Sequence, residues 1–346
     1  PFSYPSIRAF FLESATKAHA ADTIVVMPSS SPSSPNRTRI LFSFGCIYFF
    51  WGSTFLAMRI GVEVLPPFVL ASLRFLIAGS VLLLLCAIFR IRMRPTRREF
   101  AMLALIGVIM LGLGNPGVIW SEQYLSSGLA SLLAATIPLY AALIEVFLPN
   151  DGGLPLRGWI GVCIGFCGLI FLVWPGLRSS MHGDSRQIIA AAIALAGAFC
   201  WTVASVIARR STIRISGLAA AAWQLLLGGV FDTCVAFALG EYRHAKWGRQ
   251  AWGATAYLVI FGSLAGYTAY IYLLDHVAVS KVATYAYVNP VIAVALGALI
   301  LHDRFVTVEY IGMATILLAV FLVTSSRLKS GAPTPVDEDL AAKGTA

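Results

Sequence analysis

Charged residues and enzyme motifs are scarce in this chain. Asp, Glu, Lys and Arg make up 12% of its 346 residues, whereas hydrophobic residues make up 58%. The sequence contains no P-loop, H-E-x-x-H or G-x-S-x-G motif, so nothing supports P-loop ATP hydrolysis, zinc proteolysis or serine hydrolysis. The five histidines all lie in tails, loops or ends of apolar segments. This disfavours a membrane-embedded enzyme or lipid-processing factor, which is the alternative to the interpretation below.

Metal and cofactor sites also lack sequence support. The six cysteines fall within apolar stretches, and no His or carboxylate joins Cys163 and Cys167 on their shared helix face. The run GLGNPG at 112–117 matches G-x-G-x-x-G, but no predicted strand precedes it, so a dinucleotide site is not expected. We therefore expect no metal and no cofactor.

Long apolar runs dominate the chain between residues 40 and 326. A helix needs about 20 mostly apolar residues to cross about 30 Å of hydrocarbon, and open strand edges are not tolerated in lipid. The sequence therefore predicts an all-α membrane protein. Its expected transmembrane helices are 40–61, 67–89, 100–121, 126–148, 156–174, 187–208, 217–239, 251–274, 281–301 and 306–326.

Lys and Arg are distributed unevenly between the two sides of these spans. If the N-terminus is cytoplasmic, most of them lie in cytoplasmic connectors, as the positive-inside rule requires. The connector with Arg243, Lys246 and Arg249 argues the other way. The pattern predicts a multi-pass protein of the cell membrane, a bacterial inner membrane, with both termini cytoplasmic. Basic loops that face anionic lipid explain the net charge of +9 without a nucleic-acid partner.

The two ends of the chain differ in composition from the apolar part. The stretch SSSPSSPN at 29–36 is typical of disorder, and Met27 just before it is a candidate for the true start. We expect residues 1–39 to be a disordered N-terminal segment and 327–346 to be a polar cytoplasmic tail.

The chain repeats itself after about 150 residues. Trp51 lies 23 residues before Arg74, and Trp201 lies 23 residues before Gln224. Pro138 and Pro290 are separated by 152 residues. Because each half would hold an odd number of spans, the two halves must enter the membrane from opposite sides. The sequence therefore predicts an inverted-topology repeat, which many secondary transporters use for alternating access.

Three segments resemble the EamA-type transporters of the drug/metabolite transporter (DMT) superfamily. They are WGSTFLAMRIGVEVLPPFVLASLRFLIAG at 51–79, SSGLASLLAATIPLYAALIE at 126–145 and VSKVATYAYVNPVIAVALGALILHDRF at 279–305. The resemblance implies ten transmembrane helices in two inverted five-helix repeats, at 40–174 and 187–326. It also implies export of amino acids, other metabolites or drug-like compounds by proton exchange. An acidic residue that relatives often carry before the fifth span has only Asp151 as its nearest match here, whereas Asp303 supplies it in the second half.

Polar side chains inside hydrocarbon are costly, so those within the spans are candidates for function. We expect a small-molecule chamber near the midplane, and a homodimer is left open. For Arg74 the alternatives are a structural ion pair or snorkelling to an interface. The residues expected to bind substrate are Trp51, Thr54, Arg74, Asn115, Gln224, Tyr267, Tyr270, Tyr285 and Asn289.

The remaining candidates concern coupling and movement. Asp232 and Glu145 are candidates for binding a coupling proton, because burial can raise the pKa of a carboxyl group. Pro138 and Pro290 lie within spans and are candidate hinges, although static kinks would look the same in the sequence. Glu122 lies at the end of a span and is interpreted as an interfacial residue.

Overall fold

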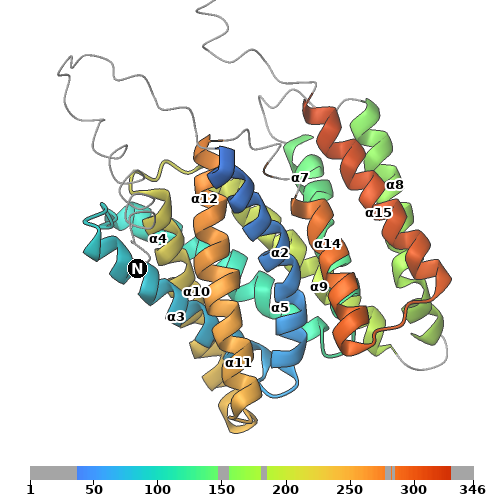
Figure 1. Cartoon of the computed structure of the whole chain (residues 1–346), viewed down its shortest axis with the longest axis horizontal. Coiled ribbons are helices and arrows are strands. Elements are labelled where there is room, and N and C mark those ends of the chain that lie inside the picture. The colour runs from blue at the N-terminus through green and yellow to red at the C-terminus, as the bar shows by residue number, and fades with distance from the viewer. Residues whose placement is uncertain (1–36, 147–155, 181–184, 277–281, 283–284, 329–346) are drawn as a thin grey trace, which may run out of the picture.

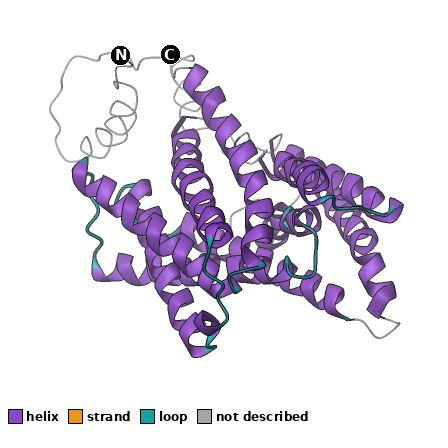
Figure 2. Ribbon diagram, turned by 60° about the horizontal axis from the view of Figure 1, so that its bottom comes forward, coloured by secondary structure: helices purple, strands orange, loops and turns teal. Residues whose placement is uncertain are grey.

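The described part of the protein is built from helices without any strand (Figure 2). The structure is a computed structural model, and it describes residues 37–146, 156–180, 185–276, 282 and 285–328. Most of the predicted 1–39 segment and of the 327–346 tail lies outside the described residues. All-helical architecture is expected in lipid, because a helix satisfies its backbone hydrogen bonds internally.

The helices follow the predicted spans closely. In the first half they are α2 (Arg37–Val62), α3 (Pro67–Ile88), α4 (Arg97–Gly107), η1 (Val108–Gly114), α5 (Asn115–Ser121), α6 (Ser127–Ala134), α7 (Ile137–Val146) and α8 (Leu156–Ser180). In the second half they are α9 (Arg186–Arg210), α10 (Gly217–Ala238), η2 (Glu241–Arg243), α11 (Arg249–Tyr257), η3 (Leu258–Ala265), α12 (Gly266–His276), α14 (Tyr285–Leu296), η4 (Gly297–Leu301) and α15 (Thr307–Leu328).

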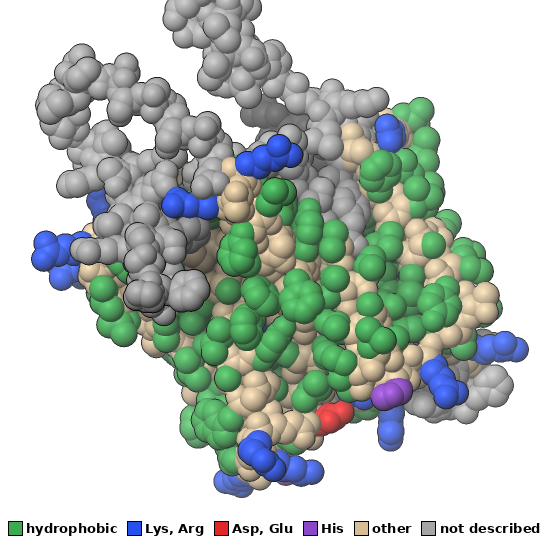
Figure 3. Space-filling view, viewed as in Figure 1, with side chains coloured by type: hydrophobic (Ala, Val, Ile, Leu, Met, Phe, Trp, Pro, Cys, Tyr) green, Lys and Arg blue, Asp and Glu red, His purple; other side chains and the backbone are tan. Residues whose placement is uncertain are grey.

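Several of these helical segments are long and apolar enough to cross a membrane. Six qualify by length and composition, and three shorter apolar helices accompany them at 156–172, 288–301 and 307–323. Large hydrophobic side chains are exposed over the outside of the bundle, while Lys and Arg gather towards its two ends (Figure 3). An apolar girdle between charged ends suits a surface that faces lipid. The six spans are 37–62, 67–88, 97–121, 127–144, 186–210 and 217–238.

At each end of the bundle, a segment between two long helices of one half is hydrogen-bonded to a helix of the other half. At the near end, where α2 begins and α15 ends (Figure 1), Trp223 Nε1 donates to the carbonyl oxygen of Met93 over 2.8 Å. At the far end, Glu241 accepts hydrogen bonds from the backbone N–H groups of Phe68 and Val69. The two halves of the chain are therefore joined by hydrogen bonds at both ends.

Helices at equivalent positions of the two halves pack against each other. The closest pairs are α3 with α10 and α8 with α15. In the first pair a Cβ atom on Gly79 would lie 2.7 Å from the backbone nitrogen of Leu226, and in the second a Cβ on Gly312 would lie 2.7 Å from that of Leu172. Only glycine permits these backbones to approach so closely.

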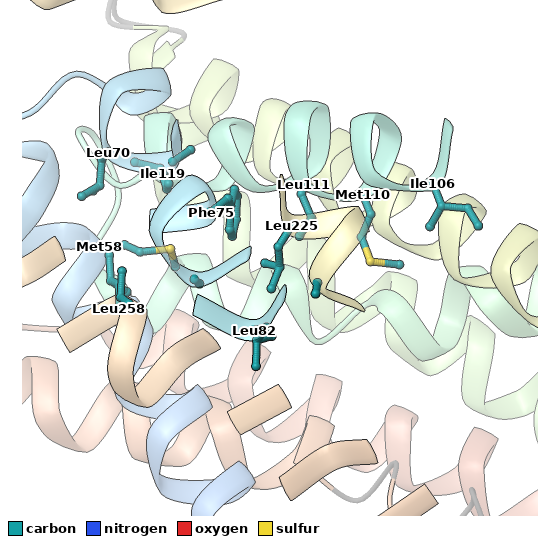
Figure 4. Packing of buried hydrophobic residues seen from close by; sticks show 14 of the residues in the cluster. Met58, Leu70, Phe75, Leu82, Ile106, Met110, Leu111, Ile119, Leu225 and Leu258 are labelled. Carbon is teal, nitrogen blue, oxygen red and sulfur yellow. The ribbon is translucent and has the colours of Figure 1, made fainter. Parts of the chain in front are cut away.

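A cluster of buried apolar residues fills the space around the α3–α10 pair. Phe75, Leu82 and Leu225 are at most 1% exposed, and Leu111 of η1 is packed with them (Figure 4). The cluster fixes α3 and α10 against η1, and this places the side chain of Arg74, which neighbours Phe75, in the interior of the bundle.

Two π-helical segments interrupt the long helices at equivalent points of the two halves. They are η1 and η3, which begin 150 residues apart. π-Bulges are rare and occur often at functional sites. The GLGNPG run lies in η1 and α5, so it is helical and does not form a glycine-rich turn.

The two candidate hinge prolines differ in their local structure. The helix breaks just before Pro138, between α6 and α7, whereas α14 continues through Pro290. Only Pro138 therefore stands beside an interruption of helical structure.

Candidate functional site

A cavity of about 450 Å³ lies between the two halves of the bundle. Both halves line it, and the lining extends from the middle of α2 to Arg209, the penultimate residue of α9 at the near end. The described lining residues that carry polar or aromatic side chains are Trp51, Thr54, Phe55, Arg74, Asn115, Ser131, Trp201, Arg209, Tyr267, Tyr285 and Asn289.

Trp51 is held at the centre of an aromatic group. Its indole Nε1–H donates to the carbonyl oxygen of Gly262 in η3 over 3.0 Å. Its ring lies 5.0 Å from that of Tyr285, edge-on at 90°, and 5.2 Å from that of Tyr270. The Tyr267 ring is 6.0 Å away. Such edge-to-face and tilted pairs are favourable geometries, so four aromatic rings from three helices form one rigid wall.

Arg74 is buried at the cavity wall without a carboxylate partner among the described residues. It is 7% exposed, and its Nε–H donates to Ser263 Oγ over 3.1 Å. Nη1 makes a weak contact with the Met58 sulfur at 3.8 Å, and the guanidinium carbon lies 5.1 Å from the centre of the Phe75 ring. No described bond involves Nη2. A buried guanidinium cannot neutralise itself, so it favours an anion in the cavity.

Two asparagines occupy different settings at the cavity. Oδ1 of Asn115 is buried and has no partner among the described residues. With its amide nitrogen facing α2, Asn289 donates to the carbonyl oxygens of Tyr48 at 3.1 Å and Ile47 at 3.3 Å. Asn289 therefore joins α14 to α2, whereas Asn115 has a free acceptor.

The structure brings most of the predicted substrate-binding residues together, with two differences. Gln224 is not among the lining residues; its backbone packs against Gly107 of α4. Tyr270 is not among the lining residues either, but its ring contacts the ring of Trp51, which is. Thr54 lines the cavity, and its hydroxyl donates to the carbonyl oxygen of Trp51 in its own helix.

Sequence reasoning missed two large residues of the lining. Trp201 and Arg209 both belong to α9 and face the cavity. The 150-residue repeat carried the signal for Trp201, because this residue is the counterpart of Trp51.

The acidic candidates lie away from the cavity lining or outside the described side chains. Asp232 of α10 is fully buried, and neither of its carboxylate oxygens has a hydrogen-bond partner among the described residues. The side chain of Glu145 lies outside the described part of the structure. Glu122, interpreted from the sequence as interfacial, is in fact 0% exposed. Packing at the far end covers the residue that follows α5, so Glu122 stands at the end of a span but is shielded from solvent.

Comparisons with known proteins agree with this architecture. The EamA-like transporter family matches the chain twice, at residues 39–174 and 188–325. An Escherichia coli (strain K12) protein named as the uncharacterized inner membrane transporter YedA is 35% identical over 281 residues, which cover 80% of this chain and 88% of that protein. The uncharacterized transporter YoaV of Bacillus subtilis is 24% identical over 79% of this chain and 92% of its own length.

A plant protein and a solved structure extend the comparison. The WAT1-related protein At3g02690, chloroplastic, of Arabidopsis thaliana is 25% identical over 80% of this chain and 67% of its own. One crystal structure aligns with a TM-score of 0.60 and 20% identity, covering 84% of this chain and 98% of the other, which shows a shared fold. The chain therefore belongs to the EamA-like transporter family, and it is a membrane protein with several helices that can span a bilayer.

Proposed function

We propose that this protein is a secondary transporter that exports small metabolites, amino acids or drug-like compounds across the cytoplasmic membrane by alternating access. The observation that carries the proposal is a cavity of about 450 Å³ between the two halves, with a buried guanidinium and an aromatic wall. Pockets of this size hold small organic molecules. Aromatic faces suit apolar parts of a substrate, and Arg74 suits an anionic group such as a carboxylate.

The proposed topology is ten transmembrane helices in two inverted five-helix repeats. The two matches to the family support it, as does the packing of α2 against η3, α12 and α14 in the same way as α9 packs against η1, α5, α6 and α7. With both termini in the cytoplasm, the near end is cytoplasmic and the cavity faces inwards. A homodimer is compatible with the proposal.

Proton exchange is the proposed source of energy. Asp232 and Glu145 remain the candidates that the sequence indicated for binding the proton, and the complete burial of Asp232 supports its candidacy. Asp232 lies outside the cavity lining, so it would act through the α3–α10 contact rather than by touching substrate.

A comparison of extracellular metabolites tests the function. Cells that overexpress the protein, cells that lack it and cells that express the Arg74→Ala variant are grown in the same medium, and released compounds are compared by mass spectrometry. The proposal expects anionic or zwitterionic compounds that increase with the native protein alone. If the compounds that change are instead converted products formed inside the cell, the membrane-embedded enzyme becomes the better explanation.

A further inference from the structure

Polar residues lie directly beyond the lining of the cavity, towards the far end of the bundle. Met58 lines the cavity and Arg59 follows it in α2; Val118 lines it and Glu122 lies four residues further along. Ser127 precedes the lining residue Ser131 by four positions in α6. Four residues of helix span about 6 Å, so Glu122 and Ser127 lie about one helical turn beyond the lining. With Arg59 they define a polar layer between the lining and the far end.

Glu122 is an ionisable group buried in this layer without a partner for its carboxylate. It is 0% exposed, and neither Oε1 nor Oε2 has a hydrogen-bond partner among the described residues. Arg59 approaches it, but Nη1 donates to the backbone carbonyl oxygen of Glu122 over 2.6 Å. An ionised carboxylate in that position would be strongly disfavoured, whereas a protonated one is tolerated.

A second carboxylate comes to the same layer from the other half of the chain. His302 adopts a left-handed conformation with φ of 59°, which turns the chain after η4, and the backbone N–H of Asp303 donates to the carbonyl oxygen of Gly297 over 3.2 Å. A Cβ atom on Gly297 would lie 2.6 Å from Asp303 Oδ2 and 2.8 Å from Ser127 Oγ. Both of these oxygens are also buried without a hydrogen-bond partner in the described structure.

The charges in this layer act on one another. Burial raises the pKa of Glu122 well above its ordinary value, the nearby Asp303 raises it further, and Arg59 opposes both effects. Burial also raises the pKa of Asp303, again opposed by Arg59. Arg59 from α2 and Asp303 from the connector after η4 are the charged groups that act on Glu122, and α6 contributes the hydroxyl of Ser127. Two neighbouring carboxylates with a single guanidinium retain a proton more readily than either would alone.

We propose that Glu122 and Asp303, with Arg59 and Ser127, form a proton-binding site that holds the far end of the cavity closed. The site rests on the proposed function, because closure and opening of the far end are the movements that alternating access requires. When the far end opens, water reaches Glu122 and its pKa falls towards the ordinary range. The closed state therefore binds more protons, and acid favours closure. Closure is most favoured below the ordinary pKa of a glutamate and weakens as the pH rises towards the raised value.

Distance measurements between spin labels test the site without a substrate. The purified protein is placed in lipid nanodiscs after the exposed Cys163, Cys167 and Cys234 are changed to serine, and labels are attached at Tyr124→Cys and Arg304→Cys, both exposed at the far end. The fraction of molecules in which the two labels are close together is then followed from pH 5 to pH 9. This range spans the ordinary pKa of a glutamate and the raised pKa of a buried one. We expect the ratio of molecules at the short distance to molecules at the long distance to fall at least threefold across this range. A factor of three in this equilibrium corresponds to about half a pKa unit between the two states.

Three variants separate a proton site from a purely structural contact. Glu122→Gln resembles the protonated acid and should keep the far end closed at every pH. Asp303→Asn removes the neighbouring negative charge and should move the midpoint to lower pH. Glu63→Gln removes an exposed carboxylate at the same end and should behave like the native protein.

The outcomes are distinct for the site and for the function. A distance distribution that does not change with pH, or a Glu122→Gln variant that keeps the native pH dependence, overturns the site even if export is observed. A response to sodium at constant pH overturns it too, because a metal cation would then be the ligand. A pH response that depends on Glu122 and Asp303 supports the site, and it does so even if no compound is exported and the proposed function fails.

Discussion

Replacing Arg74 by alanine should reduce transport of an anionic substrate about 100-fold and leave the protein in the membrane. Among the described residues Nη2 has no hydrogen bond and Nη1 makes only a weak sulfur contact, so both terminal nitrogens are available to a carboxylate. A hydrogen bond to a charged group contributes about 1.5–3 kcal/mol. Two such bonds, allowing for partial solvent replacement, amount to about 3 kcal/mol, and about 1.4 kcal/mol corresponds to a factor of ten.

The assay measures initial export rates over a range of intracellular substrate concentrations, normalised to the amount of protein in the membrane. Arg74→Lys should recover part of the activity, because an ammonium keeps the charge but lacks the planar fork that binds a carboxylate through two bonds. Arg243→Ala is the matched control, since it removes an exposed arginine from the far-end connector. Normal export by Arg74→Ala would refute the anion-binding argument, and loss of the protein from the membrane would assign Arg74 a structural role instead.

Two further predictions rest on single contacts, and a third rests on the distribution of Lys and Arg. Trp51→Phe keeps an aromatic ring but loses the hydrogen bond to Gly262, which should weaken substrate binding by about 1 kcal/mol in a binding titration. An unchanged affinity would show that this hydrogen bond does not contribute to substrate binding. Gly312→Ala should destabilise the α8–α15 contact by about 1–3 kcal/mol and lower the unfolding temperature in detergent, whereas Gly253→Ala, whose Cβ meets open space, should not; equal effects would contradict the packing argument. A reporter enzyme fused after residue 346 should be active only on the cytoplasmic side, and activity outside the cell would exclude an even number of spans from a cytoplasmic start.

The helical architecture was predictable because the bilayer leaves few alternatives. A chain that is 58% hydrophobic and has regularly spaced apolar runs can satisfy its backbone in lipid only as helices. The π-helical segments η1 and η3 were not predictable in the same way. Their apolar residues follow the pattern of an ordinary helix, and the change to π-helical hydrogen bonding appears only in the folded backbone.

The repeat predicted the cavity in part. It indicated Asn115 and Tyr267 as equivalent points of the two halves, and the structure places both at the cavity. The same logic suggested Gln224 as the counterpart of Arg74, but Gln224 is not among the lining residues, and α10 presents its backbone to Gly107. Sequence symmetry gives depth in the membrane, but the rotation of a helix about its axis depends on its neighbours.

Glu122 shows a different limit of the sequence. A glutamate at the end of an apolar segment is ordinarily a residue that faces water at the membrane interface. Here the connector that carries Asp303 and the end of α2 that carries Arg59 come from distant parts of the chain and converge with Glu122 at the far end. The sequence around Glu122 does not indicate that these segments pack against it, so its burial could be found only in the folded protein.

Counterflow in proteoliposomes tests the central claim most directly. The purified protein is reconstituted, the vesicles are loaded with the compound that the metabolite comparison identifies, and uptake of a trace of the same labelled compound from outside is followed. A carrier with one alternating cavity should accumulate the label faster when the vesicles are preloaded, and the compound should be recovered chemically unchanged. An uptake rate that does not depend on preloading would indicate a pore, and recovery of a chemically altered compound would contradict the transporter account.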